Sequence, residues 1–470
     1  MKSEKEGLNI SAKSFIVAIV IIFALMIGTY ILTIVLPGGE YARVIDANGN
    51  SIIDTAGGFK YVDGGISFWK WLLSPILVLG AEGSGTIIAV LAFLLIIGGV
   101  FNALTECGLM NYMLGKIVHR FGSVKYKLMA ILCFFFMAMG SLVGSFEEVV
   151  PMSPIVVALS IALGWDALTG VGMSLLAAGC GFAAGVANPF TVGVAQGLAG
   201  LPMFSGMWLR LVSFAFIYAL LLGFLRHYAK KIDKASELEL GGCRVQNDYV
   251  KDEGMDKALV AFASILGIGI ITVLCSSFIE FLQDYTMIIV ALMFLIAGVV
   301  SALVTGMKGR QLGRSFMSGL IAISPSIIMI LMASSIKYTL VESRILDTML
   351  HGAVSIAESM PKAEVILFIY LICLVMNFFI PSGSAKAFLL IPLIVPIAQI
   401  FGISAQLCIV AFAFGDGFSN VFYPTNPALL ITLGLSDVGY GQWAKFSWKF
   451  QCLNLLLTSA LLLLGLATAY

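Results

Sequence analysis

Four polar segments interrupt long apolar runs of this sequence, and they contain the side chains best suited to bind a small charged solute. Two of them are GSFEE at 144–148 and PSGSAK at 381–386. The other two, 179–191 and 415–427, each contain Asn-Pro, and we call them the first break and the second break. Proline frees a backbone carbonyl one turn back in a helix, and in lipid that carbonyl needs another partner, such as a cation. The candidate binding residues are Ser145, Glu147, Glu148, Asn188, Thr191, Ser382, Ser384, Lys386, Asp416, Asn420, Thr425 and Asn426.

Ionisable groups at membrane depth are costly and are usually functional. Glu147 and Glu148 share one polar segment, Lys386 lies in another, and Asp416 lies in the second break. Acids in one segment and a lysine in another predict a site for a solute with both an ammonium and a carboxylate. One glutamate can instead cap a helix N-terminus, and Asp416 can be a structural partner. Two candidate sodium sites combine serine and asparagine oxygens: Ser145 with Asn188, and Ser384 with Asn426.

The composition places the protein in a lipid bilayer. Of its 470 residues, 60% are hydrophobic and 11% are charged, with a mean hydropathy of +1.02, whereas a soluble protein has about 25% charged residues. A net charge of +1 gives no basic patch for nucleic acid. The eight cysteines form no CxxC pair or Cys/His cluster, which argues against a disulfide scaffold, a zinc enzyme and a haem protein. We expect no cofactor and no enzyme activity, because no nucleophile is accompanied by a base or a metal set.

Apolar runs long enough to span the hydrocarbon core, about 20 residues, recur along the chain. The first is too long for a signal-peptide core, so we expect a retained anchor. After it, Asn48-Gly49 between β-prone arms predicts a hairpin in an external loop at 37–83. Runs 128–164 and 363–401 are too long for one crossing, and each has a polar segment in its middle. The other nine predict single crossings: 14–36, 84–106, 168–200, 205–226, 257–281, 287–306, 320–342, 404–435 and 447–469.

Basic residues indicate how the two long runs are arranged, because Lys and Arg are concentrated in cytoplasmic loops. The loop around Arg120 and the segment around Lys230 should both be cytoplasmic, so run 128–164 enters and leaves on one side. A pair of full crossings and a re-entrant hairpin both satisfy this condition. Each arm has only about 16 apolar residues, which is short for a crossing, so we expect hairpins. GSFEE is then the first tip, PSGSAK is the second tip, the N-terminus is cytoplasmic and the C-terminus is external.

The chain resembles itself at a shift of 238 positions, the difference between Pro392 and Pro154. This shift superposes the two tips and the two breaks, with Asn188 on Asn426. Inverted repeats with broken helices are typical of secondary transporters, which bind substrate near the membrane midplane. The sequence therefore predicts an all-α polytopic membrane protein. Its parts are a cytoplasmic N-terminus at 1–13, a first repeat at 14–226 with the hairpin 128–164, a cytoplasmic linker at 227–256, a connecting helix at 257–281 that inverts the second copy, and a second repeat at 282–470 with the hairpin 363–401.

Four motifs carry a resemblance to a known family: GSFEEVVPMSP, GVANPFTVGVAQGLAGLP, PSGSAKAFLLIP and YPTNPALL. They resemble the YfcC-type family, which is named for basic amino-acid antiport and is related to the anaerobic four-carbon dicarboxylate carriers of the ion transporter superfamily. The similarity covers nearly the whole chain. It implies an elevator-type carrier of the cell inner membrane with two opposed hairpins, assembled as a homodimer.

The residues and the resemblance together predict a secondary active transporter of amino acids. The expected substrate is cationic, arginine or ornithine, carried by exchange or with sodium or a proton as the coupling ion. Uptake of a four-carbon dicarboxylate, coupled to sodium or protons, is an alternative. An ion channel, which would use the same polar breaks, is an alternative of another class.

Overall fold

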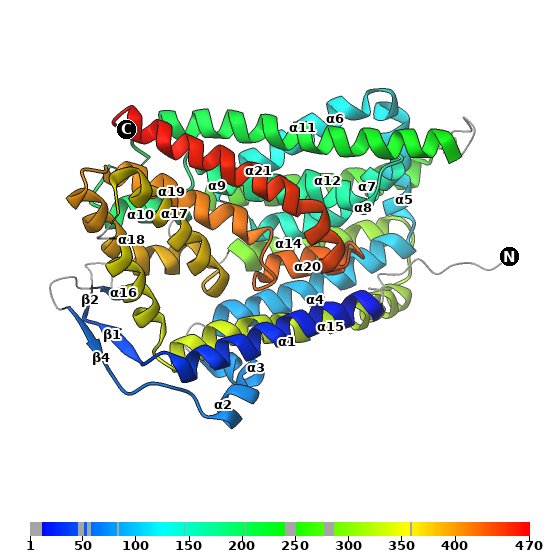
Figure 1. Ribbon diagram of the computed structural model, residues 1–470. Coiled ribbons are helices and arrows are strands. Elements are labelled where there is room, and N and C mark those ends of the chain that lie inside the picture. The colour runs from blue at the N-terminus through cyan, green and yellow to red at the C-terminus, as the bar shows by residue number, and fades with distance from the viewer. Residues whose placement is uncertain are drawn as a thin grey trace.

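Helices build most of the structure, a computed structural model that describes residues 12–45, 51–53, 58–81, 84–144, 146–202, 204–239, 251–276, 286–357 and 360–470 (Figure 1). The predicted α-helical class is confirmed, and the strands among the described residues are short. The candidate residue Ser145 and the turn Asn48-Gly49 lie outside the described residues.

The first half of the chain follows the predicted order. Run 128–164 divides at the first tip into two arms, α6 with η3 and η4 with α7. The elements are α1 Ala12–Val35, β1 Gly39–Tyr41, β2 Arg43–Ile45, β3 Ser51–Ile53, β4 Phe59–Tyr61, α2 Phe68–Leu72, α3 Ser74–Leu77, η1 Val78–Gly80, α4 Ser84–Glu106, α5 Leu109–Phe121, η2 Gly122–Val124, α6 Lys125–Ala138, η3 Met139–Val143, η4 Glu147–Met152, α7 Ser153–Ala162, α8 Ala167–Val171, η5 Gly172–Leu176, α9 Ala177–Ala184, η6 Pro189–Gly193, α10 Val194–Leu198 and α11 Met207–Glu239.

The second half also contains two helices that are joined at a tip, an interrupted helix and a long final helix. Run 363–401 divides at the second tip into α17 and α18. The elements are α12 Glu253–Ser276, α14 Thr286–Val304, α15 Gly309–Glu342, α16 Leu346–Ala357, α17 Lys362–Phe379, α18 Gly383–Ile400, α19 Ala405–Asn420, α20 Pro427–Leu435 and α21 Tyr440–Ala467. The core surrounds α9 and α19, which pack on each other and are buried almost throughout.

The predicted β-hairpin is confirmed in its arms, because β2 and β3 pair antiparallel with Val44 opposite Ile52. Strands β1 and β4 pair beside them. Both Tyr41 and Arg43 bind the carboxylate of Asp347 in α16, each at 3.0 Å. Burial and this carboxylate raise the pKa of Tyr41 to about 12. The strands are therefore fastened to the second half of the chain.

Different segments of the chain lie at the two ends of the helix bundle (Figure 1). Helix α1 begins at one end, and the chain finishes after α21 at the other. At the first end, Lys125 of the basic loop binds Asp233 of α11 at 2.6 Å. At the opposite end, the hydroxyl of Tyr470 donates to the carbonyl oxygen of Gly206. The basic segments that we expect in the cytoplasm thus share one end, although which end faces the cytoplasm stays a prediction.

Among the described residues, six helices are long and apolar enough to cross a membrane, or up to eight if each of two bent pairs is one span. The six include both arms of the second hairpin, each 18 residues long, and a 19-residue arm of the first, Lys125–Val143. This arm is longer than the sequence indicated, because its helix begins within the basic loop. The nine crossings and the re-entrant hairpins therefore stay predictions.

Candidate functional site

The first break interrupts its helix where the sequence predicts. Helix α9 ends at Ala184, and Gly185 follows with a φ of 49°, a left-handed conformation that glycine adopts without strain. The chain turns into η6 at Asn188, whose Oδ1 accepts hydrogen bonds from the backbone N–H groups of Phe190 at 2.9 Å and Thr191 at 3.2 Å. Asn188 is thus an N-cap, the role in which asparagine is favoured.

The second break has the same construction. Helix α19 ends at Asn420, and α20 begins at Pro427. Oδ1 of Asn426 accepts from the backbone N–H of Leu429 at 3.3 Å, while its Nδ2 donates to Oδ1 of Asn420 at 2.9 Å. Both interruptions are confirmed, and both asparagines cap the helix that follows.

The two interrupted helices cross each other through small residues. A Cβ atom added to Gly417 would meet the backbone of Ala183, and one added to Gly179 would meet the side chain of Val421. Under the shift of 238 positions, Gly179 corresponds to Gly417 and Ala183 to Val421. Each contact is therefore the counterpart of the other, and the crossing brings the two breaks together.

This crossing leads to a stability prediction. We expect Gly417→Ala to lower the free energy of unfolding by about 1–3 kcal/mol, because the added methyl group overpacks the contact with Ala183. The matched control is Gly223→Ala on α11, where a Cβ meets nothing within 4 Å and the better helix former should be neutral or stabilising. Thermal unfolding of the purified variants is the measurement. Equal melting temperatures would show that the crossing tolerates a side chain.

The end of η3 and the first tip both contact the first break. The backbone N–H of Val186 donates to Oγ of Ser141 at 3.0 Å, and the N–H of Ala187 donates to the carbonyl oxygen of Ser141 at 3.0 Å. Gly144 has a φ of 76°, and a Cβ there would collide with Oδ1 of Asn188. Ser141, just before the tip, thus accepts hydrogen bonds from two backbone N–H groups of the break that have no helical partner.

The second tip reaches both breaks. A Cβ atom added to Gly383 would lie 2.6 Å from Oδ2 of Asp416 and 2.6 Å from Cγ2 of Thr191. Its neighbours differ in burial, since Ser382 is exposed and Ser384 is half-buried. Side chains from the first break, the second break and the second tip therefore meet around Gly383.

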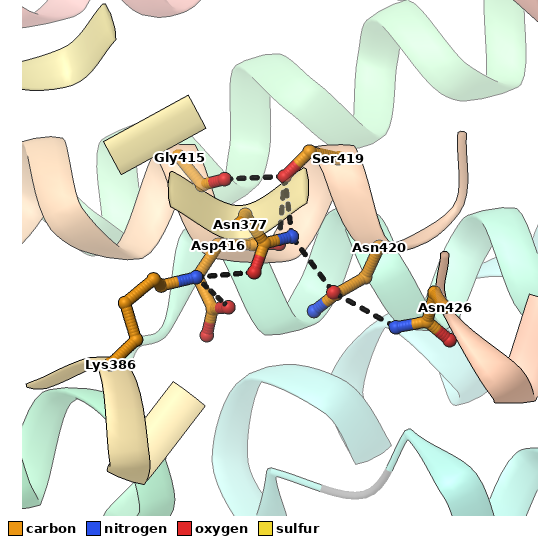
Figure 2. Close-up of polar contacts among 7 residues, drawn as sticks. All are labelled: Asn377, Lys386, Gly415, Asp416, Ser419, Asn420 and Asn426. Carbon is orange, nitrogen blue, oxygen red and sulfur yellow. Dashed lines mark hydrogen bonds and ion pairs between the residues drawn. The ribbon is translucent and has the colours of Figure 1, made fainter. Parts of the chain in front are cut away.

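Lys386 and Asp416 form an ion pair in which both side chains are fully buried. Figure 2 shows the Lys386 ammonium directed at Asp416 Oδ1, at 2.5 Å, and at Oδ1 of Asn377. Asn377 in turn donates to Ser419 Oγ at 2.7 Å and to Asn420 Oδ1 at 2.8 Å. The sequence reading missed Asn377, although an amide in the apolar run LICLVMNFFIP is itself a signal.

Several buried polar atoms around these residues have no hydrogen-bond partner among the described residues. They include Nδ2 of Asn188, Oγ1 of Thr191, Oδ2 of Asp416 and Oγ1 of Thr425. Buried polar groups are nearly always hydrogen-bonded in proteins. A donor, hydroxyls and an acceptor from both breaks are therefore available to a polar solute.

The two glutamates of the first tip face different surroundings. Glu147 is exposed, and its negative charge and that of Asp416 repel each other. Glu148 is half-buried, and its Oε2 has no hydrogen-bond partner. No Lys or Arg of the described chain forms an ion pair with either. The cavity beside Glu148 is apolar, with Met139, Met152, Leu266, Gly269, Val290, Met293 and Phe294 in its wall.

The candidate sodium sites are only partly placed. Ser145 lies outside the described residues, and the side-chain oxygens of Asn188 and Asn426 both accept capping hydrogen bonds. Within the described ranges, no group of three or more His, Cys, Asp or Glu could hold a metal ion. The sodium sites stay predictions.

Known proteins resemble this chain over most of its length. The protein named "Putative basic amino acid antiporter YfcC" of Escherichia coli is 30% identical over 381 residues, 77% of this chain and 74% of that protein. An uncharacterized protein of Haemophilus influenzae is 24% identical over 389 residues, which are 81% of this chain and 76% of that protein.

Two solved transporter structures align with low similarity. The Alcanivorax borkumensis YdaH transporter has a TM-score of 0.43 and 17% identity, over 97% of this chain and 99% of that one. Neisseria gonorrhoeae MtrF, described among antimetabolite efflux pumps, has a TM-score of 0.39 and 16% identity, over 95% and 94%.

The family comparison covers the apolar helices, both tips and both breaks. The model of the C4-dicarboxylate anaerobic carriers, DcuC, matches residues 15–467. The chain is a multi-pass membrane transporter and belongs to the C4-dicarboxylate anaerobic carrier family.

Proposed function

We propose that this protein is a secondary active transporter of cationic amino acids such as arginine and ornithine. The charge of the site is the observation that carries the proposal. Lys386 is neutralised by Asp416, whereas Glu147 and Glu148 have no cationic partner in the part of the chain that the structure describes. The site therefore has an excess of two negative charges when all four groups are ionised, which attracts a cation and repels a dicarboxylate.

The unpartnered atoms suggest how the substrate lies. Its cationic group would bind between Glu147 and Oδ2 of Asp416, because these two carboxylates come from different halves of the chain and repel each other unless a cation lies between them. Its polar remainder would meet Nδ2 of Asn188 and the hydroxyls of Thr191 and Thr425. These groups cost little to engage, because none has to give up a hydrogen bond within the protein.

We also propose an inverted repeat and elevator-type alternating access. The reciprocal contacts of Gly179 with Val421 and of Gly417 with Ala183 support a two-fold relation between the halves. Gly144 of the first tip packs on Asn188 of the first break, in the middle of the apolar segment Ala167–Leu198, which supports a hairpin that ends at membrane depth. A cytoplasmic N-terminus, an external C-terminus, coupling to sodium or protons and a homodimer belong to the same proposal.

The family description favours a second candidate, transport of a four-carbon dicarboxylate. The two candidates predict opposite ligand preferences. We expect lysine, arginine and ornithine to raise the melting temperature of the purified protein, while alanine and succinate do not. Stabilisation by succinate alone would refute the cationic assignment and favour the dicarboxylate carrier.

A further inference from the structure

We propose that an amino acid substrate separates the Lys386–Asp416 ion pair by binding both of its residues, and we call this ion pair the latch. The cationic group of the substrate binds Asp416, and the carboxylate of the substrate binds Lys386. This inference rests on the proposed function, because it concerns the same site.

The surroundings of the pair leave one carboxylate oxygen of Asp416 without a hydrogen-bond partner. Its Oδ1 binds Lys386 at 2.5 Å, whereas its Oδ2 has no partner and faces Gly383 and Thr191. Because the pair is fully buried and Gly383 packs closely on this oxygen, a cation reaches Asp416 only when the second tip moves aside, while Lys386 still holds the opposite oxygen.

Lys386 is held entirely by its own half of the chain. Its ammonium contacts Asn377 on α17 and Asp416 on α19, and it lies 5.5 Å from the ring centre of Phe412, also on α19. Figure 2 shows the side chain extended from α18 toward these helices. When a substrate cation takes Asp416, Asn377 can keep the ammonium in the site, ready to bind a carboxylate.

The cost of an unpaired buried charge makes this latch selective. Breaking a buried ion pair from one side is strongly unfavourable, because the other charge loses its compensation. An amine without a carboxylate would take Asp416 and leave Lys386 unpaired. A dicarboxylate would take Lys386 and leave Asp416 unpaired. A solute with a cationic group and a carboxylate leaves neither Asp416 nor Lys386 unpaired. Only ligands that lack one of these groups therefore bear the free-energy cost of an unpaired buried charge.

The test compares arginine with agmatine, which is arginine without its carboxylate. By calorimetric titration of the purified full chain, we expect wild type to bind arginine at least 100-fold more tightly than agmatine. In Lys386→Met this ratio should fall at least tenfold, because agmatine no longer competes with a tethered ammonium and arginine loses its carboxylate partner. Lys386→Gln, which keeps a polar side chain beside Asn377, should lower the ratio of arginine affinity to agmatine affinity by a similar factor.

Equal affinity of wild type for arginine and agmatine would overturn the latch while leaving the proposed function intact, and this arm needs no variant to fold. A folded Lys386→Met or Lys386→Gln protein with an unchanged ratio would also overturn the latch. If wild type binds succinate but neither arginine, lysine nor ornithine, the proposed function fails, and the latch fails with it.

Discussion

Replacing Asp416 with asparagine is expected to abolish transport of cationic amino acids and to destabilise the protein by about 3–5 kcal/mol. The stability loss follows because Asp416 is the carboxylate that compensates Lys386, and both side chains are fully buried. The transport loss follows because the unpartnered Oδ2 is the proposed ligand of the substrate cation. Uptake by proteoliposomes and thermal unfolding measure the two effects.

A double variant separates these effects. Asp416→Asn with Lys386→Met replaces the ion pair by uncharged side chains, and such replacements are often neutral or stabilising. We expect it to unfold near the wild-type temperature but to remain inactive. Recovery of transport in the double variant would mean that Asp416 serves only to neutralise Lys386 and does not bind substrate.

Replacing Glu147 with glutamine should weaken binding of arginine and ornithine by about ten- to hundredfold. Opposite charges about 4 Å apart attract by about 4 kcal/mol at an effective dielectric of 20. Because Glu147 is exposed, water screens this attraction and reduces the expected loss. Titration of the purified variant with each amino acid is the measurement.

Glu148→Gln is the matched control, because this side chain lines an apolar cavity. We expect a smaller effect that is equal for all ligands, as for a residue that stabilises the N-terminal turn of η4. A larger loss of arginine binding in Glu148→Gln than in Glu147→Gln would contradict this assignment and would show that Glu148 binds the substrate cation.

The broken helices could be predicted from the sequence because their causes are local. Pro189 and Pro427 remove backbone donors, and the preceding asparagines are strong N-caps. The same holds for the arms around Asn48-Gly49, where turn residues between β-prone segments set the strand pairing. The division of the two long apolar runs also followed from their polar tips.

The partner of Lys386 could not be predicted, because packing decides it. Lys386 and Asp416 lie on different helices, and the sequence predicted a solute role for Lys386 while it left both a solute and a structural role open for Asp416. Only the packing of α18 on α19 brings their charged atoms to 2.5 Å. Likewise, the different burial of the two adjacent glutamates depends on the tight 3₁₀ turn that begins η4, which a helical periodicity does not specify.

Counterflow in proteoliposomes tests the central claim most directly. Vesicles loaded with unlabelled arginine should take up labelled arginine and ornithine in a saturable manner, whereas vesicles loaded with succinate should not accumulate labelled succinate. Saturable counterflow of succinate without that of arginine would contradict the cationic assignment. Conductance without any counterflow would contradict a carrier altogether and favour a channel.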